Sequence, residues 1–433
     1  MISSADIDQL KPFQARSIIE ELRKGSVPVE YVPLFTVGRQ HWLTFIEDDL
    51  TNYIAEGGSK VRFISGDYGD GKTHFMSIVR HLAMEKEFAV SFVVLTREVP
   101  IHKFETVYQT IVKQLRGKFE GIGIRNMLEA WLTELGETTA LKGKKAEAKK
   151  AMDEFTAKLQ SIKGMDINFA NALTALVNNR FAPMAKDEEE QRAAAYEILL
   201  HWFEGGKVTK KELKPFQIYE FLNKTNSKQF LNSLILFLRS TGHKGLILLM
   251  DELETVVAQG TSIRNAAYEN VRLLIDNSES SQYLHIFFSI IPEVLISEKG
   301  FKSYDALWSR IRSIGESKKL NYRGVLVDIH KTPLKDKELV DLGRYLRTIH
   351  GISYRWESQE IVSDEIMEQI CTSQKRMGVL SEVRLFIKQL IRILDMAEQG
   401  ESPEDINMNE QIVETRREMD AEKVEHVQPS WDS

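Results

Sequence analysis

The sequence has almost no cysteine and no long hydrophobic run. Cys371 is the single cysteine among 433 residues, so no disulfide can form within the chain, as is typical of proteins from a reducing compartment. No apolar stretch approaches the ~20 residues that a membrane-spanning helix requires. The first residues have neither the basic nor the apolar region of a secretory signal. We therefore expect a cytoplasmic protein that makes no membrane contact.

An excess of charge of one sign is also lacking. The 57 Lys and Arg residues are balanced by 63 Asp and Glu residues, a net charge of −6, so no overall basic field indicates nucleic-acid binding, although local basic patches remain compatible with it. The ten histidines show no metal-binding spacing and no Gly-x-Ser-x-Gly motif is present, so neither a metal other than Mg²⁺ nor a serine hydrolase is indicated. Length predicts two to three domains.

The strongest signal is a glycine-rich segment after a short apolar run. Residues 61–65 predict a buried strand, and the next eight match G-x-x-x-x-G-K-[ST], the phosphate-binding loop. From Thr73 the pattern becomes helical, so a helix N-terminus would point at a bound anion. The loop residues are Gly66, Asp67, Tyr68, Gly69, Asp70, Gly71, Lys72 and Thr73.

The residue types of the loop suit nucleotide binding. Its glycines allow successive amide groups to wrap a phosphate. Lys72 is predicted to contact the β- and γ-phosphates, and the Thr73 hydroxyl to bind Mg²⁺. Tyr68 and Asp70 are expected to shape the loop rather than react. His74 follows the loop, and we interpret it as a histidine on the helix surface.

Four further apolar runs predict strands, at 88–95, 245–250, 283–290 and 325–329. Helical patterns separate them, which favours a parallel sheet with helices on both faces. About 150 residues with a mostly helical pattern lie between the second and third strands. Within them, 141–158 is rich in Lys, Ala and Glu. A solvated helix is the simpler interpretation of that stretch, and a basic binding surface is the alternative.

The strand at 245–250 ends in acidic residues. Asp251 is predicted to hold Mg²⁺ through water, and Glu252 to orient or deprotonate the attacking water. Glu254 is either a further acidic contact or a solvated charge at a helix start. Paired with the loop at 66–73, this strand end predicts ATP hydrolysis.

Hydrolysis also needs polar and cationic groups near the γ-phosphate. Ser289, near the end of the fourth strand, is the candidate polar sensor. Arg310 is a candidate arginine finger for a neighbouring subunit, with Arg312 as the second choice. Arg384 opens an amphipathic helix and is the candidate cation from the C-terminal region. Each of these arginines has an ordinary surface charge as its alternative interpretation.

The order of these parts resembles the AAA+ ATPases, especially their initiator-like branch. It is also similar to the ATP-binding protein family of BREX-type phage-defence loci. The stretches that carry this resemblance are 35–39, 66–75, 97–100, 245–254 and 307–311. It implies that Gly38 and Arg39 form a box beside the adenine. Related ATPases commonly have a proline before the sensor arginine, whereas Val383 precedes Arg384 here.

The predicted fold is α/β: a parallel-sheet P-loop (AAA+-like) ATPase core with a long helical insertion and a C-terminal helical lid. We expect an N-terminal helical segment with the Gly-Arg box at 1–54 and the core at 55–330, with the insertion at about 118–240. The lid follows at 331–398 and a polar, disordered or loosely attached tail at 399–433.

Three functions fit these features. The first is a homo-oligomeric ATPase, a ring or filament, that couples ATP turnover to a helicase- or nuclease-like partner acting on DNA in anti-phage defence. The second is a nucleotide-controlled switch or scaffold with little turnover. The third, a replication-initiator-like loader, is disfavoured because the residues after Ala397 are too few for a winged helix. ATP and Mg²⁺ are the expected cofactors.

Overall fold

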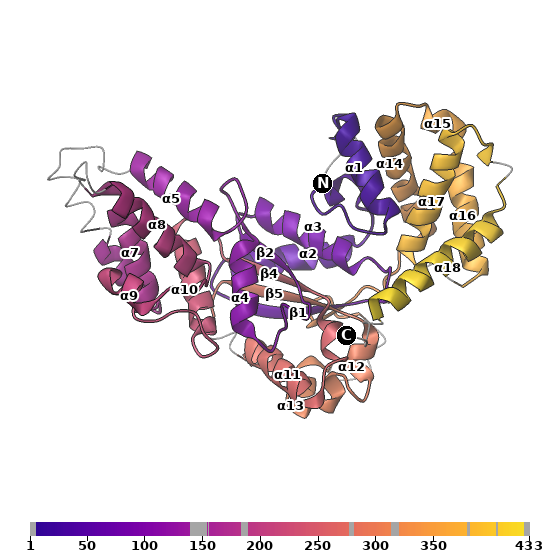
Figure 1. The fold of residues 1–433 in the computed structure, drawn as a ribbon. Helices are drawn as coiled ribbons and strands as arrows, with labels where there is room; N and C mark the ends of the chain where they lie inside the picture. Colours follow the sequence, from indigo (N-terminus) through magenta and orange to yellow (C-terminus); the bar gives the residue numbers. More distant parts are fainter. Residues whose placement is uncertain are drawn as a thin grey trace. The chain divides into compact units, whose positions relative to one another are not determined.

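A six-stranded sheet carries every strand predicted from the sequence (Figure 1). The strands lie in the order β3-β2-β4-β5-β1-β6, and β2 pairs in parallel with β4, as does β4 with β5. The very short β3 pairs antiparallel with β2 and was not predicted. The strands are β1 (Ser59–Ser65), β2 (Ala89–Val94), β3 (Leu115–Arg116), β4 (Leu246–Asp251), β5 (Leu284–Ile290) and β6 (Leu326–Asp328).

The computed structural model describes residues 6–138, 154, 156–182, 189–276, 281–312, 320–378, 382–403 and 406–427. The chain divides into two units. The first unit consists of Met1–Thr44, Ile64–His81 and Val327–Ser433, and the second of Phe45–Phe63 and Leu82–Leu326. Strands β1 and β6 each supply residues to both units.

The central strands are apolar along their whole length because both of their faces are covered. Every residue of β4 and of β5 is buried, which explains why these strands read as continuous hydrophobic runs rather than alternating patterns. In the second unit, Phe63 of β1 stacks on Phe288 of β5, with ring centroids 5.5 Å apart.

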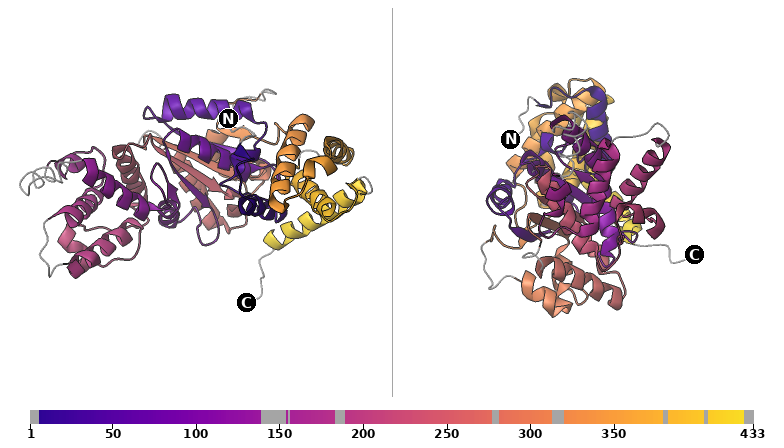
Figure 2. Two further views of the ribbon diagram at one scale, coloured as in Figure 1. Left: turned by 90° about the horizontal axis from the view of Figure 1, so that it is seen from above. Right: turned by 90° about the vertical axis from the view of Figure 1, so that its left-hand side faces the viewer.

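Helices fill the long segment between β2 and β4, as the sequence predicted. They lie side by side in the views of Figures 1 and 2, and their shared core contains Phe169, Trp202, Phe203 and Phe230. The two ends of the insertion meet where the Lys118 amide donates to His243 Nε2 over 3.2 Å. The helices between β2 and β4 are α4 (Phe104–Lys113), α5 (Ile124–Thr138), α7 (Ile167–Phe181), α8 (Glu189–Phe203), α9 (Lys210–Leu213) and α10 (Ser227–Ser240).

The remaining helices of the second unit follow β4 and β5. They are α11 (Thr261–Asp276), α12 (Pro292–Ile296) and α13 (Asp305–Ile311). Of the Lys- and Ala-rich stretch at 141–158, residues 141–153 and 155 lie outside the described part of the chain, so neither interpretation of that stretch is tested.

The first unit contains a helical group in which the N-terminal α1 packs on the C-terminal helices (Figure 1). Ile18 and Ile19 of α1 share a core with Leu346 and Leu390, and Arg23 pairs with Asp395 at 2.7 Å. The helices are α1 (Pro12–Arg23), α14 (Asp336–Tyr354), α15 (Ser358–Ile361), α16 (Asp364–Arg376), α17 (Val383–Glu398) and α18 (Met408–Val427). Two further helices pass from one unit to the other, α2 (Gln40–Asp49) and α3 (Lys72–Glu85).

The segment expected to be a disordered or loosely attached tail instead contains α18. Ile412 and Met419 of this helix are buried and form a small cluster with Leu385 of α17. The prediction failed because α18 is polar on average, and its two buried apolar residues, seven positions apart, are too few to show a clear helical period.

Candidate functional site

The glycine-rich segment forms a tight loop between β1 and α3 in the first unit. Gly69 and Gly71 have φ values of +93° and +90°, a region that side chains disfavour. A Cβ on Gly66 would lie 2.7 Å from a side-chain carbon of Ile329, so this position has no room for a larger residue. Helix α3 begins at Lys72, which places a helix N-terminus directly after the loop and makes it suited to an anion.

Lys72 is buried and its ammonium lies against the loop itself. Nζ donates to the carbonyl oxygens of Gly66, at 2.9 Å, and Asp67, at 3.3 Å. The same nitrogen lies 5.1 Å from the centroid of the Tyr68 ring. The cation is therefore held inside the curve of the loop, where the motif requires it.

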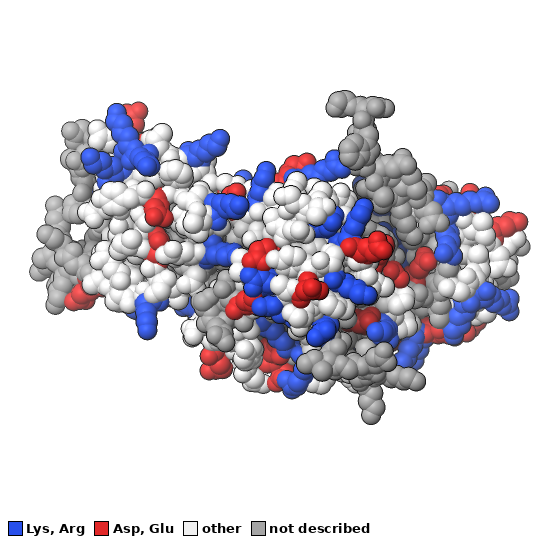
Figure 3. Space-filling view, turned by 90° about the horizontal axis from the view of Figure 1, so that it is seen from below, with Lys and Arg blue, Asp and Glu red and all other residues white. Residues whose placement is uncertain are grey.

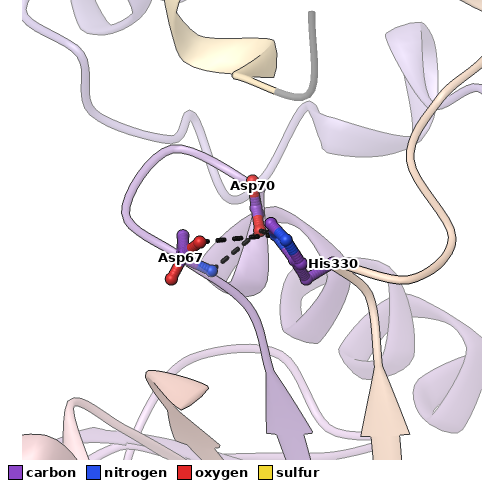
Figure 4. A group of neighbouring side chains, drawn as sticks. All are labelled: Asp67, Asp70 and His330. Atoms are coloured by element: carbon purple, nitrogen blue, oxygen red, sulfur yellow. Dashed lines mark hydrogen bonds and ion pairs between the residues drawn. The ribbon is translucent and has the colours of Figure 1, made fainter. Parts of the chain in front are cut away.

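Asp70 bridges the loop internally, through Asp67, and joins it to the segment after β6. Its Oδ2 accepts the Asp67 amide at 2.7 Å and lies 3.0 Å from His330 Nδ1 (Figure 4). The Asp70 side chain is only 3% exposed. The hydrogen bond from His330 to Asp70 raises the pKa of His330 above its ordinary value. Sequence reasoning expected Asp70 to shape the loop but did not find His330.

Asp67, Asp70 and His330 also have the donor set of a small cation site. One ligand atom from each lies within 4.8 Å of the others. Two carboxylates and an imidazole suit a divalent metal, but the same atoms already form hydrogen bonds and ion pairs with one another.

The guanidinium of Arg39, in the Gly-Arg box, is engaged in hydrogen bonds that connect separate segments of the chain. Its guanidinium donates to the carbonyl oxygens of Ile329, Thr332 and Asp70 at 2.7, 2.6 and 3.1 Å. Burial lowers the pKa of Arg39 to about 10. Gly38 has φ +66°, and a Cβ there would lie 2.6 Å from the Leu334 side chain. Arg39 thus connects the box, the loop and the segment after β6.

His74 differs from the expected surface histidine. It is partly buried, with Nε2 3.0 Å from Thr36 Oγ1 and its ring 5.4 Å from Phe35. The Thr36 hydroxyl donates to the Val32 carbonyl at 2.8 Å, so Nε2 is the donor to Thr36. Loss of hydration lowers the pKa of His74 to about 4, and the ring is therefore neutral near pH 7.

Arg384 lies at the start of α17, beside the loop. Its amide donates to the Gly69 carbonyl at 3.3 Å, and a Cβ on Gly69 would lie 3.5 Å from Arg384 Cβ. Helix α17 therefore touches the phosphate loop within the first unit. The predicted role of the Arg384 side chain toward phosphates stays a prediction.

In the second unit, Asp251, Glu252 and Ser289 form one group. Parallel pairing of β4 with β5 sets Met250 opposite Phe288, and one residue further on the Ser289 hydroxyl donates to Asp251 Oδ1. The Glu252 amide donates to Ser289 Oγ at 2.9 Å. Asp251 and Ser289 are buried, whereas Glu252 is exposed and has φ +62°. The strand end presents one fixed carboxylate and one exposed carboxylate.

The two finger candidates have different surroundings in the second unit. Arg310 forms a bidentate salt bridge with Asp276, in which Nη2 lies 2.8 Å from Oδ2. Arg312 is exposed and caps the end of α13. The arginine chosen first from the sequence is thus engaged within its own chain.

The predicted residues therefore fall into separate groups. The first unit brings together the loop, Gly38, Arg39, His74 and the start of α17. The second unit brings together Asp251, Glu252 and Ser289, while Arg310 pairs with Asp276. Contacts between sequence-distant residues, such as Asp70 with His330, were missed because they follow no local spacing.

These features define a mixed α/β protein whose mostly parallel sheet is consistent with a P-loop ATPase core. The family described as BREX system ATP-binding protein BrxC/D matches residues 10–415, and the chain belongs to this family. No curated protein and no solved structure matches the chain. Among the described helices, none combines the length and apolar character that crossing a membrane would require.

Proposed function

We propose that the protein binds ATP with Mg²⁺ at the loop 66–73 and hydrolyses it as part of anti-phage defence. The observation that carries this proposal is the glycine-rich loop between β1 and α3, with the Lys72 ammonium held against the loop carbonyls. The family description, an ATP-binding protein of the BREX system, supports the same ligand.

In this proposal Asp251, the last residue of β4, and Glu252, which follows it, complete the site. Thr73 and Asp251 hold Mg²⁺, and Glu252 activates the attacking water. Two observations support these roles. Ser289 holds the Asp251 carboxylate in one orientation, as a metal ligand requires, and the exposed Glu252 is accessible to water. Gly38 and Arg39 are assigned to the adenine side, with Arg384 as a cation toward the phosphates.

We infer that DNA is reached mainly through a partner. The net charge is −6, and acidic and basic side chains are interspersed among the described residues on the face shown in Figure 3. Without a continuous basic area on that face, long-range attraction to DNA there is weak. The proposed assembly is a homo-oligomer that binds ATP and acts with a helicase- or nuclease-like BREX protein.

A nucleotide-controlled switch with little turnover is the second candidate. The pairing of Arg310 with Asp276 fits it, because within this chain Arg310 binds a carboxylate and not a phosphate. Such a protein would bind ATP tightly and signal by changing its assembly.

One experiment separates these functions. ATP binding, steady-state hydrolysis with and without DNA, and mass in ATP would be measured for the wild type and for Lys72→Ala. We expect loss of tight ATP binding in Lys72→Ala because the cation that neutralises the γ-phosphate is removed. Lys86→Ala is a matched control, since Lys86 pairs with Glu47 on the surface. Unchanged ATP affinity in Lys72→Ala would contradict the assignment of the loop, and binding without turnover would favour the switch.

A further inference from the structure

The phosphate loop carries two carboxylates of its own. Asp67 and Asp70 occupy variable positions between the glycines, and Asp70 is buried. Nucleotide phosphates are anionic, so negative charges this close would weaken their binding unless something compensates. A compensating group is therefore expected beside these two aspartates.

His330 is placed to compensate them. The loop leaves β1 and His330 follows β6, and the imidazole points at both carboxylates (Figure 4). Nδ1 lies 3.0 Å from Asp70 Oδ2 and 3.4 Å from Asp67 Oδ2. The Asp70 oxygen that meets His330 also accepts the Asp67 amide. The charge on His330 thus acts on the group that closes the loop.

We propose that His330 is a positioning residue for the nucleotide: its protonated imidazole offsets part of the negative charge of the loop aspartates, holds Asp70 on the Asp67 amide, and so strengthens binding of the phosphates. This inference rests on the proposed function, that is, on nucleotide binding at 66–73. His330 acts through Asp70 and touches no phosphate itself.

The surroundings of His330 are predominantly acidic. The hydrogen bond to Asp70, and then the charges of Asp70, Asp67 and Asp328, raise its pKa, while partial burial opposes them. The nearby cations have their own partners: Arg39 and Lys72 donate to backbone carbonyl oxygens, and Lys331 pairs with Asp328. The charged groups around this site are Asp67, Asp70, Lys72, Arg39, Asp328 and Lys331.

The direction of the pH effect follows from this raised pKa. The positive charge is fully present at a pH below the ordinary pKa of histidine and is lost as the pH rises through the higher pKa of His330. Nucleotide affinity should therefore be greatest in mildly acidic solution and fall as the pH increases. By linkage, bound nucleotide must in turn raise the pKa of His330.

The test is the dissociation constant of Mg-ADP measured by calorimetry from about pH 6 to about pH 8.5, a range that spans histidine titration. For the wild type we expect affinity to fall by about fivefold or more across this range. His330→Asn keeps a donor near the Nδ1 position without a charge, so its affinity should be lower at acidic pH and its pH dependence should shrink to the part due to the phosphates. His330→Arg keeps a fixed charge and should also remove the part of the pH dependence that is due to His330, while keeping high affinity.

His201→Gln is the control for removal of an ordinary histidine, because His201 is exposed and its ion-pair partner, Glu204, lies outside the loop. It should follow the wild-type profile, including the part due to the phosphates. Histidine NMR adds a second measurement: the His330 resonance should titrate at a higher pH with Mg-ADP bound than without it.

Several results would overturn the inference. One is a parallel pH dependence in the wild type and His330→Asn with correct folding shown by circular dichroism, and another is a His330 pKa unchanged by Mg-ADP. Affinity that depends on added Zn²⁺ in the wild type but not in His330→Asn would make the three residues a metal site instead. A wild type that binds no nucleotide at any pH would refute the proposed function itself.

Discussion

Ser289 contacts both acidic residues at the end of β4, Asp251 and Glu252. Its hydroxyl donates to Asp251, and its oxygen accepts the amide of Glu252, so one buried serine fixes one side chain and one backbone turn. Glu252 adopts a left-handed backbone conformation, which is uncommon for this residue type. The exposed Glu252 carboxylate is therefore set by its backbone, and Asp251 by its hydrogen bond.

We expect Glu252→Gln to retain ATP binding while slowing hydrolysis by about 100-fold or more, because an amide cannot accept the proton of the attacking water. Turnover would be measured at saturating ATP, with affinity measured separately. Glu293→Gln makes the same chemical change at an exposed position of α12 and should leave turnover as it is. Wild-type turnover in Glu252→Gln would show that another group positions the water.

At the residue scale, local motifs allowed some predictions and not others. Lys72 and Thr73 follow from a fixed spacing around glycines. His330 and Thr36 contact the loop and α3 only because the fold brings distant segments together, and no spacing in the sequence indicates that. The interpretation of His74 failed for the same reason, since its neighbours come from 35–36.

Among the elements, the long apolar strands could be predicted from the sequence. The very short strand β3 and the polar helix α18 could not. Strands β4 and β5 are buried throughout and read as uninterrupted apolar runs. Strand β3 has only two residues, too few for any period. Helix α18 is held by a few apolar contacts on an otherwise polar surface.

Helix α18 gives a prediction at this scale. Ile412 is fully buried and packs with Leu385 and Met419, so Ile412→Ala should cost about 2 kcal/mol or more of the free energy of unfolding of this region. Thermal unfolding and hydrogen exchange across α18 would measure the change. Val413→Ala is the matched control, because the neighbouring Val413 is 38% exposed. Equal effects of the two substitutions would show that α18 does not pack as described.

For the whole molecule, the central question is whether one chain completes the site of another. Arg310 pairs with Asp276 in the second unit. The pair is partly exposed, and such ion pairs contribute little to stability, so releasing Arg310 to a phosphate would carry a small cost. The pairing of Arg310 with Asp276 is therefore compatible with a role of Arg310 at the nucleotide of a neighbouring subunit.

Mixing Arg310→Ala with Lys72→Ala protein tests this. An arginine finger supplied in trans contributes about 10³-fold or more to the rate. We expect each variant alone to be inactive and the mixture to recover part of the activity, because an intact loop then meets an intact Arg310. Mass measurement in ATP would confirm assembly. An assembled mixture that stays inactive at every ratio would leave Arg310 as a structural cation.

The two ends of the helical insertion lie close together, and this affects how freely the length of the insertion can change. The amide of Lys118 and the ring of His243 join the two ends of a segment of more than a hundred residues, and burial lowers the pKa of His243 to about 4, which keeps its ring a neutral acceptor. Because the segment enters and leaves at one point between β2 and β4, its length is uncoupled from the register of the sheet. The length of the insertion can therefore change while the pairing of the strands on either side of it stays the same.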